Sequence, residues 1–345
     1  MEWLTEHDLD AILIRSPANL RYLTGFTGEG LAVIGVAGRA VSTDSRYAIE
    51  VKEEALGYKA VLVPEGHLAG ALQFLGEIEC RALAFEADNT CYSEFETLRK
   101  KLKGVKLKGV KGVVEGQRRV KDAVEIALIR QAAGIVDRVL TPMLAAPPLG
   151  ITEKEFALRL ETEMLRAGAD SIAFDTIAAV GPHAAQCHAV PGNDILRRGQ
   201  MLKVDCGACV GGYRSDITRT VFMGKPTKQF RDVYTAVYDA QQAAVKAVRA
   251  GVGGAELDRV ARGVLEERGY GDKFGHGLGH GVGLQIHEGP GLGTRSQDTL
   301  EKGMVVTVEP GVYIEGWGGV RVEDTVVVTT RGCEVLTNTP KLQFD

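Results

Sequence analysis

The chain has 345 residues, a quarter of them charged, and a formal net charge of −4. This length allows two domains with a large buried core, and the mildly acidic balance argues against a nucleic-acid partner or an anionic membrane surface. The longest apolar stretches are far shorter than the ~18–20 residues that a membrane span needs, and the acidic start "MEWLTEHDLD" lacks a secretory pattern. The six cysteines follow no framework spacing, so we expect reduced thiols in a cytoplasmic protein.

The first third of the chain alternates strand-sized apolar runs with helical patterns. Strands are predicted at 11–14, 31–36, 59–63 and 82–86, and helices at 46–56 and 93–103. We therefore expect a small α/β domain over residues 1–115. The Lys- and Gly-rich stretch 103–121 is expected to contain a linker or a last exposed strand. No aromatic residue is interleaved with its basic residues, so we interpret it as a solvated face rather than a nucleic-acid patch.

The pattern changes after residue 121, and we expect a second domain over residues 116–345. Helices are predicted at 123–144 and 152–168, the latter opened by a Thr152 and Glu155 capping box and closed by Gly168. A strand near 172–180 and a hairpin-like pair over 201–223 follow. The order then recurs, with helices at 227–250 and 255–268, a Gly- and His-rich segment, and a hairpin-like pair at 304–329. This predicts an α+β domain of two pseudo-symmetric halves, whose helices cover one face of a curved antiparallel sheet.

Each hairpin carries two acidic residues that are expected to face each other. In the first, Gly211 and Gly212 form the natural turn, which places Asp205 almost opposite Asp216. In the second, the turn lies at 315–319, which places Glu309 opposite Glu323 by the same reasoning. Both pairs sit on strands that are otherwise rich in apolar residues.

Facing carboxylates destabilise a sheet, and their burial costs several kcal/mol per ion unless something compensates. Two divalent metal ions would cancel the four negative charges. The alternative is that these acids point outward at strand edges. We favour the metal interpretation because both pairs flank Gly-rich turns in apolar strands.

The segment "FGHGLGHGVGLQIHEGP" at 274–290 concentrates His276, His280 and His287. Its glycines argue against a helix, and the Glu of a His-Glu-x-x-His zinc motif is absent. A Gly-rich strand or loop that approaches a metal closely fits better. The glycines match neither a phosphate loop nor a dinucleotide fingerprint, so nucleotide binding is not expected.

The motifs "VDCGACVGGYRSDITRT", "GHGVGLQIHE", "TVEPGVYI" and "GGVRVEDTVVVT" resemble, in order, those of the pita-bread metallopeptidases. That family contains Xaa-Pro dipeptidases (prolidases), aminopeptidase P and, more distantly, methionine aminopeptidases and creatinase. The resemblance runs through nearly all of 122–330. The N-terminal "STDSRYAIEVKEEA" is similar to the creatinase-like N-terminal domain of the prolidase and aminopeptidase P branch. The resemblance implies a pita-bread catalytic domain behind a creatinase-like α/β domain.

The resemblance also implies a set of site residues. It makes Asp205, Asp216, His280, Glu309 and Glu323 the ligands of a dinuclear metal centre, with Asp216 and Glu323 bridging. On the substrate side it implies His188, His276, His287, Tyr313 and Arg321. A ligand set this rich in oxygen favours manganese, with cobalt or zinc as substitutes. Catalytically silent relatives lose these ligands, whereas this chain keeps all five.

Three residues depart from the family pattern and bear on the shape of the pocket. Cys187 stands where Pro is common, and Cys206 and Val210 stand where larger or aromatic residues are frequent. Cys206 and Cys209 form a Cys-x-x-Cys on a predicted strand, where they would point to opposite faces and could share neither a disulfide nor a metal. We expect both thiols to be small apolar fillers.

The expected reaction is hydrolysis of an Xaa-Pro bond by a hydroxide that bridges the two metal ions. Glu309 would shuttle the proton, and His287 with His188 would stabilise the oxyanion. We expect an Xaa-Pro dipeptide or short proline peptide as the substrate and a homodimer as the assembly. Arg295 and Arg46 are candidate holders of a substrate carboxylate. Aminopeptidase P activity on longer peptides and a silent peptide-binding protein are the alternatives.

Overall fold

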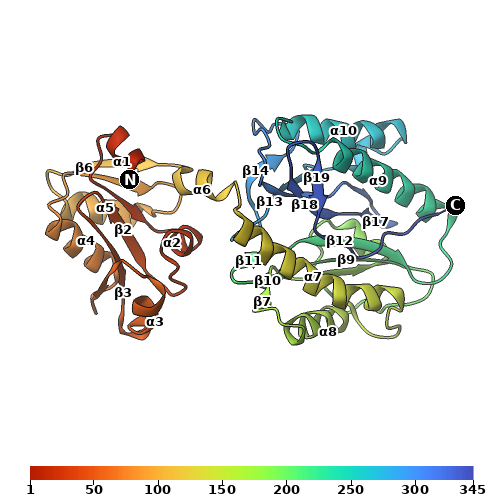
Figure 1. Cartoon of the computed structure of the whole chain (residues 1–345). Coiled ribbons are helices and arrows are strands. Elements are labelled where there is room, and N and C mark those ends of the chain that lie inside the picture. The colour runs from red at the N-terminus through yellow and green to blue at the C-terminus, as the bar shows by residue number, and fades with distance from the viewer. Residues whose placement is uncertain (345) are drawn as a thin grey trace. The chain divides into compact units, whose positions relative to one another are not determined.

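The computed structural model describes residues 1–344 as two compact units, Met1–Gln117 and the part from Arg118 onward. Figure 1 colours the first unit from red to orange-yellow and the second from yellow to blue. Within the described residues, no helix is both long and apolar enough to cross a bilayer.

A six-stranded sheet with the order β4-β3-β2-β1-β5-β6 forms the centre of the first unit. Its strands are β1 Ala11–Ile14, β2 Leu31–Gly35, β3 Gly38–Thr43, β4 Lys59–Leu62, β5 Ala82–Glu86 and β6 Lys106–Val110. β1 pairs antiparallel with β2 and parallel with β5. Ala11 and Leu13 of β1 belong to one hydrophobic cluster, and Ile12 and Ile14 belong to another. The sheet is therefore buried on both faces, as in α/β proteins.

The four strands expected in this unit are confirmed, and the stretch 103–121 contains the edge strand β6. The helices are α1 Glu2–Glu6, α2 Pro17–Thr24, α3 Glu50–Glu54, α4 His67–Glu77, α5 Tyr92–Lys101 and α6 Val113–Arg118. The prediction of one helix over 46–56 is wrong. Asp44 accepts a hydrogen bond from the backbone N–H of Arg46 and thereby caps a separate 3-10 turn, Ser45–Tyr47, so that only the short α3 remains.

The second unit repeats two helices followed by antiparallel strands (Figure 1). The first half contains α7 Ala123–Ala145, α8 Glu153–Arg166, β7 Ser171–Ile172, β8 Ile177–Val180, β9 Met201–Cys206, β10 Ala208–Val210, β11 Tyr213–Arg214 and β12 Ile217–Phe222. The second half contains α9 Lys228–Ala247, α10 Gly254–Glu267, β13 Gly279–Gly281, β14 Glu288–Leu292, β15 Val305–Val308, β16 Gly311–Ile314, β17 Gly318–Arg321, β18 Asp324–Val328 and β19 Cys333–Val335. The α+β expectation is confirmed.

Each pair of helices shares a core cluster with strands of its own half, and Ile129 and Ala133 of α7 also pack on β15 and β18. One core cluster joins α7 and α8 to β8, β9 and β12, and another joins α9 and α10 to β15, β17 and β18. Thr152 caps α8 by accepting the N–H of Glu155, but the Glu155 carboxylate pairs with Arg159, so the capping box expected there is only half formed. The halves meet where Thr220 on β12 exchanges hydrogen bonds with the backbone of Arg321 on β17.

The register of the first hairpin differs from the expectation. Asp205 pairs with Thr218, so Asp216 lies two residues away from the position opposite Asp205. The register is the same on both sides of Gly207, since Cys206 pairs with Ile217 and Cys209 with Arg214, and it is centred on the Gly211–Gly212 turn. Between β9 and β10, the carbonyl of Ser215 packs against the backbone of Gly207. A Cβ on residue 207 would lie 1.9 Å from that oxygen, so only glycine fits. The shift of two residues keeps Asp216 on the same face as Asp205.

The second hairpin has the expected register. Val308 pairs with Asp324 on one side of the two glutamates, and Gly311 pairs with Arg321 on the other. Glu309 and Glu323 therefore lie opposite each other at the junction between β15–β18 and β16–β17.

We expect Gly207→Ala to lower the free energy of unfolding by ~1–3 kcal/mol, because the new methyl group must displace the Ser215 carbonyl. Gly134→Ala in the middle of α7 is the matched control, since its Cβ would meet only the Arg138 side chain, at 3.6 Å. The control should raise stability by about 0.5–1 kcal/mol. Urea denaturation of both variants, after a chelator has removed any metal, measures the change in the free energy of unfolding that each substitution causes. Equal changes would contradict the close contact inferred at Gly207.

Candidate metal centre

Two hairpins and one Gly-rich strand carry the five residues expected to hold metal. Asp205 lies on β9 and Asp216 directly precedes β12, whereas Glu309 follows β15 and Glu323 directly precedes β18. His280 lies on the three-residue strand β13, between Gly279 and Gly281. The prediction of a strand or loop rather than a helix in this segment is confirmed.

The structure brings these five side chains together. Oxygen atoms of Asp205, Asp216 and Glu323 all lie within 4.8 Å of one another, and all three residues are buried. The Nε2 atom of His280 lies 3.6 Å from Oδ2 of Asp216 and 3.3 Å from Oε1 of Glu309. The alternative in which the acids point outward at strand edges is wrong.

Two oxygens of this cluster have no hydrogen-bond partner among the described residues. They are Oδ1 of Asp205 and Oε1 of Glu323, and both are buried. The second oxygen of each carboxylate accepts a hydrogen bond. Arg321 donates to Oδ2 of Asp205. The hydroxyl of Thr218 donates to Oε2 of Glu323 at 2.7 Å. A buried carboxylate oxygen without a donor is costly unless it binds a cation. The donor set therefore fits hard divalent ions.

The electrostatics of the cluster also favour a cation. Burial, followed by the charges of Glu323 and Asp205, raises the pKa of Asp216 well above its usual range. Burial, followed by the charges of Glu309 and Asp205, does the same to the pKa of Glu323. Glu309 differs: burial would raise its pKa, but hydrogen bonding and charge from His280 outweigh burial and lower it to about 2. The raised pKa values of Asp216 and Glu323 mean that, without a metal ion, their surroundings favour the protonated carboxyls.

Arg321 is the cation that the protein itself places beside the acids. Its guanidinium is 1 % exposed and donates to Asp205, and its Nε lies 4.0 Å from Oε2 of Glu309. It also donates to Thr218 Oγ1 at 2.9 Å and to the hydroxyl of Tyr313 at 2.8 Å. A single guanidinium cannot neutralise four carboxylates, so it orients Asp205 rather than replacing a metal.

A cavity of about 260 Å³ opens over the acids. All five candidate ligands line it, as do His188, His276, His287, Cys187, Phe174 and Ile177. The rings of His280 and His287 lie 4.3 Å apart. Burial and the charge of His280 lower the pKa of His287, so this imidazole is neutral at pH 7 and can donate one hydrogen bond.

Cys187 and Tyr313 join His276 to Arg321 at the wall of this cavity. Tyr313 Oη lies 2.9 Å from Nε2 of His276 and accepts a hydrogen bond from Cys187 Sγ at 3.4 Å. Burial would raise the pKa of the Cys187 thiol, but hydrogen bonding with His276 and the charge of Arg321 outweigh it and lower the pKa to about 6.

The two arginines expected to hold a substrate carboxylate lie in different units. Arg295 lines a neighbouring cavity of about 690 Å³, which shares His276, Gly277 and Gly279 with the first. Within residues 1–344, Arg295 has no ion pair. Arg46 belongs to the first unit, where Asp44 and Glu29 hold its guanidinium at 2.8 and 2.9 Å.

The Cys-x-x-Cys motif supplies no thiol to this site. Cys206 and Cys209 are both buried and both free, and Cys206 belongs to the apolar cluster under α7 and α8. Burial raises the pKa of Cys206 well above its usual range, which keeps the thiol protonated. The expectation of apolar fillers agrees with this burial.

Two buried charges near the site were not anticipated. Lys203 on β9 donates to the carbonyls of Ala184, Gln186 and Cys187, and Glu153 on α8 accepts two backbone N–H groups. Lys203 interrupts an otherwise apolar strand pattern. A lysine at such a position is expected to be buried, and a buried ammonium needs hydrogen-bond acceptors, so the sequence did contain a signal for this residue. Glu153 gave no such signal, because an acid in the first turn of a helix is common on protein surfaces.

The fold and the site define a metallohydrolase of the pita-bread class. The chain belongs to metallopeptidase family M24, whose sequence model matches residues 127–330, and the creatinase/prolidase N-terminal domain matches residues 1–120. An uncharacterized peptidase of Bacillus subtilis is 39% identical over 334 residues, which cover 96% of this chain and 95% of that protein.

Solved structures of two relatives cover almost the whole chain. The Xaa-Pro dipeptidase from Bacillus anthracis is 37% identical with a TM-score of 0.95, covering 99% of this chain and 96% of its own. The X-Pro aminopeptidase from Thermotoga maritima is also 37% identical, with a TM-score of 0.90 and 97% coverage of both chains. Overall similarity therefore establishes the family, but it does not determine whether the substrate is a dipeptide or a longer peptide.

Removal of one buried charge should stabilise the metal-free protein in a pH-dependent way. The raised pKa means that folded Asp216 keeps its proton at pH values where the unfolded chain, with a pKa of about 3.9, has lost it. Wild-type stability therefore falls as pH rises through this window, and Asp216→Asn has no proton to lose. Between the unfolded and the folded pKa of Asp216, the free energy of unfolding of the variant should therefore gain roughly 1.4 kcal/mol per pH unit relative to the wild type.

Urea unfolding of chelated protein at pH 5 and pH 8 measures this advantage. Asp232→Asn is the control, because Asp232 is an exposed partner of Lys228 and its substitution should change stability by less than about 0.5 kcal/mol at either pH. If Asp216→Asn changes the free energy of unfolding by the same amount at both pH values, the pKa of the Asp216 carboxyl is not raised by burial and its neighbours.

Proposed function

We propose that this protein is a dinuclear metal peptidase that hydrolyses the Xaa-Pro bond of dipeptides. The supporting observation is the convergence of four carboxylates and one imidazole on a single cavity, with two buried oxygens that lack any donor among the described residues. A homodimer is part of the same prediction and rests on the family resemblance.

In this proposal two divalent ions would be held by Asp205, Asp216, His280, Glu309 and Glu323. The oxygen-rich set favours manganese, and cobalt or zinc could substitute. Two such ions supply Lewis acidity and a nucleophilic water at neutral pH. The catalytically silent alternative is disfavoured because it has no use for four buried acids, which cost folding free energy without cations.

The chain's own groups then move the proton and bind the substrate. The carboxylate of Glu309, held by the Thr307 hydroxyl at 3.0 Å, is ionised and can accept a proton and return it to the departing nitrogen. Neutral His287 can donate a hydrogen bond to the oxyanion, and His188 lines the same cavity from another loop. An Xaa-Pro nitrogen carries no hydrogen before cleavage, so its protonation is essential for departure.

Arg295 supports the choice of a dipeptide. It lies in the cavity next to the acids and has no ion pair within residues 1–344, so its guanidinium is available to a carboxylate. A bidentate pair with the proline carboxylate would select a substrate that ends at proline. The second candidate, aminopeptidase P activity, is supported by the size of that same cavity, about 690 Å³, which has room for further residues.

Metal removal tests the proposed centre. The protein freed of metal by a chelator should bind two equivalents of Mn²⁺. Each filled site should raise its free energy of unfolding by about 2.7 kcal/mol at a free Mn²⁺ concentration of 100 times the Kd of that site. Glu323→Gln should weaken both effects, whereas Glu334→Gln, which alters an exposed partner of Arg130, should not. Elemental analysis and thermal unfolding measure these quantities, and a protein that takes up no ion would end the proposal.

Substrate length separates the two peptidase activities. With Mn²⁺ bound, we expect kcat/KM for Ala-Pro to exceed that for Ala-Pro-Ala by about tenfold or more, since a charged hydrogen bond to the terminal carboxylate is worth that ratio. Arg295→Ala should remove the preference by lowering the Ala-Pro value, and Arg331→Ala, at an exposed arginine, should leave it intact. Turnover of the tripeptide alone would identify aminopeptidase P activity instead.

A further inference from the structure

The segment 181–192, "GPHAAQCHAVPG", leads from β8 toward β9 and carries Cys187 and His188 into the cavity wall. It begins with a 3-10 turn, Gly181–Ala185, and contains no β-strand. A segment without a hydrogen-bonded ladder needs other partners for its backbone groups if it is to present His188 in one position. Two buried charges provide them.

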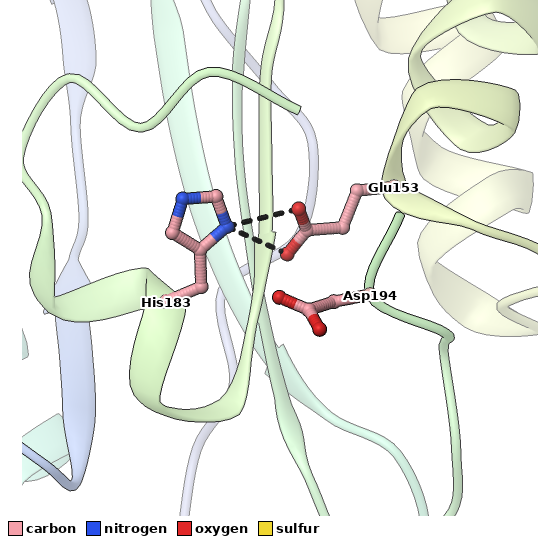
Figure 2. A group of neighbouring side chains, drawn as sticks. All are labelled: Glu153, His183 and Asp194. Atoms are coloured by element: carbon pink, nitrogen blue, oxygen red, sulfur yellow. Dashed lines mark hydrogen bonds and ion pairs between the residues drawn. The ribbon is translucent and has the colours of Figure 1, made fainter. Parts of the chain in front are cut away.

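Glu153 joins the two ends of this segment. Its side chain is fully buried at the first position of α8. Oε1 accepts the N–H of Val180 at 2.7 Å, and Oε2 accepts the N–H of Gly192 at 2.7 Å. Nδ1 of His183 lies 3.0 and 2.9 Å from the same two oxygens, and Figure 2 shows this ring facing the carboxylate.

Lys203 holds the middle of the segment from β9. Its fully buried ammonium donates to the carbonyls of Ala184 at 2.9 Å, Gln186 at 2.6 Å and Cys187 at 3.3 Å. Nζ of Lys203 forms no ion pair with a carboxylate of the described chain. The carboxylate therefore binds N–H groups at the ends of the segment, while the ammonium binds carbonyls between them.

The cluster of Glu153, His183 and Asp194 could also be considered as a metal site, since its donor atoms lie within 4.8 Å of one another (Figure 2). The contacts of Glu153 argue against it. Both of its oxygens already accept a backbone N–H group, and the side chain of Asp194 is exposed. The carboxylate is explained by the backbone that it binds.

We propose that Glu153 is a positioning residue, which holds segment 181–192 so that His188 faces the substrate cavity. Its catalytic consequence rests on the proposed peptidase function. Displacement of a substrate-facing group by about 1 Å can cost 10²-fold in rate, so a remote clamp of this kind matters for turnover. Glutamine cannot replace Glu153, because its NH₂ group would face one of the two N–H donors and leave it unpaired.

Hydrogen exchange tests the clamp without any assay of activity. In Glu153→Gln, backbone amides of 181–192 should exchange about tenfold faster or more, because hydrogen bonds to a charged acceptor are lost. The matched control is Asp137→Asn on α7, since Asp137 likewise accepts two backbone N–H groups, those of Asn338 and Thr339. It should leave exchange in 181–192 unchanged. Wild-type exchange rates in folded Glu153→Gln would overturn the proposal.

A double-mutant cycle with His188 distinguishes positioning from general destabilisation. With metal content unchanged, Glu153→Gln should lower kcat/KM for Ala-Pro by about 10²-fold, and Asp137→Asn should not. If Glu153 acts through His188, adding Glu153→Gln to His188→Ala should lower the rate by no more than about threefold further. Fully additive losses would overturn the proposal.

Two further outcomes are separated by this design. If the wild type cleaves neither peptide, the proposed function fails, and the exchange experiment still decides on the clamp. If Glu153→Gln does not fold, Glu153→Asp takes its place, because a side chain shorter by one methylene can reach only one of the two N–H groups. Faster exchange limited to 181–192 in that variant supports the proposal, and unchanged exchange overturns it.

Discussion

Burial of carboxylates in an antiparallel sheet is the constraint on which the second unit is built. Asp205, Asp216 and Glu323 place oxygens within 4.8 Å of one another, and burial prevents water from screening their charges. The protein compensates in part with the guanidinium of Arg321 and the hydroxyl of Thr218. Within the described chain, Oδ1 of Asp205 and Oε1 of Glu323 are left without donors, so these two oxygens can bind cations. The fold tolerates the cost of burying them at the place where a cation would bind.

Three of the histidines around these acids, His188, His276 and His287, lie outside helices and strands, and a charged side chain holds the segment of each. Glu153 and Lys203 hold the one that carries His188. For His276 the holder is Arg262, which donates to the carbonyl of His276 at 2.9 Å and pairs with Asp258 on the same helix. For His287 it is the neighbouring Glu288, which is bound by Lys121 at 2.7 Å and by Arg118. Rigid elements thus anchor loops through charged hydrogen bonds, which preorganises the groups around a substrate.

Two adjoining cavities lie beside the buried acids. The cavity above the acids is small, about 260 Å³, and its wall at His276 is shared with the cavity that contains Arg295. A dipeptidase and an aminopeptidase of the same fold resemble this chain to the same degree. Because relatives with either activity share this fold, overall similarity does not separate a dipeptidase from an aminopeptidase.

Short apolar runs in the sequence were sufficient to predict β1, β2, β4 and β5, because strands that pack against a core need apolar residues. The turn around Gly316 likewise determined that Glu309 faces Glu323, since hairpin register follows from turn position. The close contact at Gly207 was decided only in three dimensions, by a carbonyl that approaches from eight residues away.

The roles of Glu153 and Lys203 also required the tertiary structure. Their partners are backbone N–H and C=O groups, which every residue carries, so even a lysine that stands out in an apolar strand does not reveal which groups it binds. Apolar residues that recur along a strand, and charged residues at matching distances from a hairpin turn, can be recognised in the sequence. Charges that are paired with the backbone of a distant segment become visible only when the chain has folded and brought the two together.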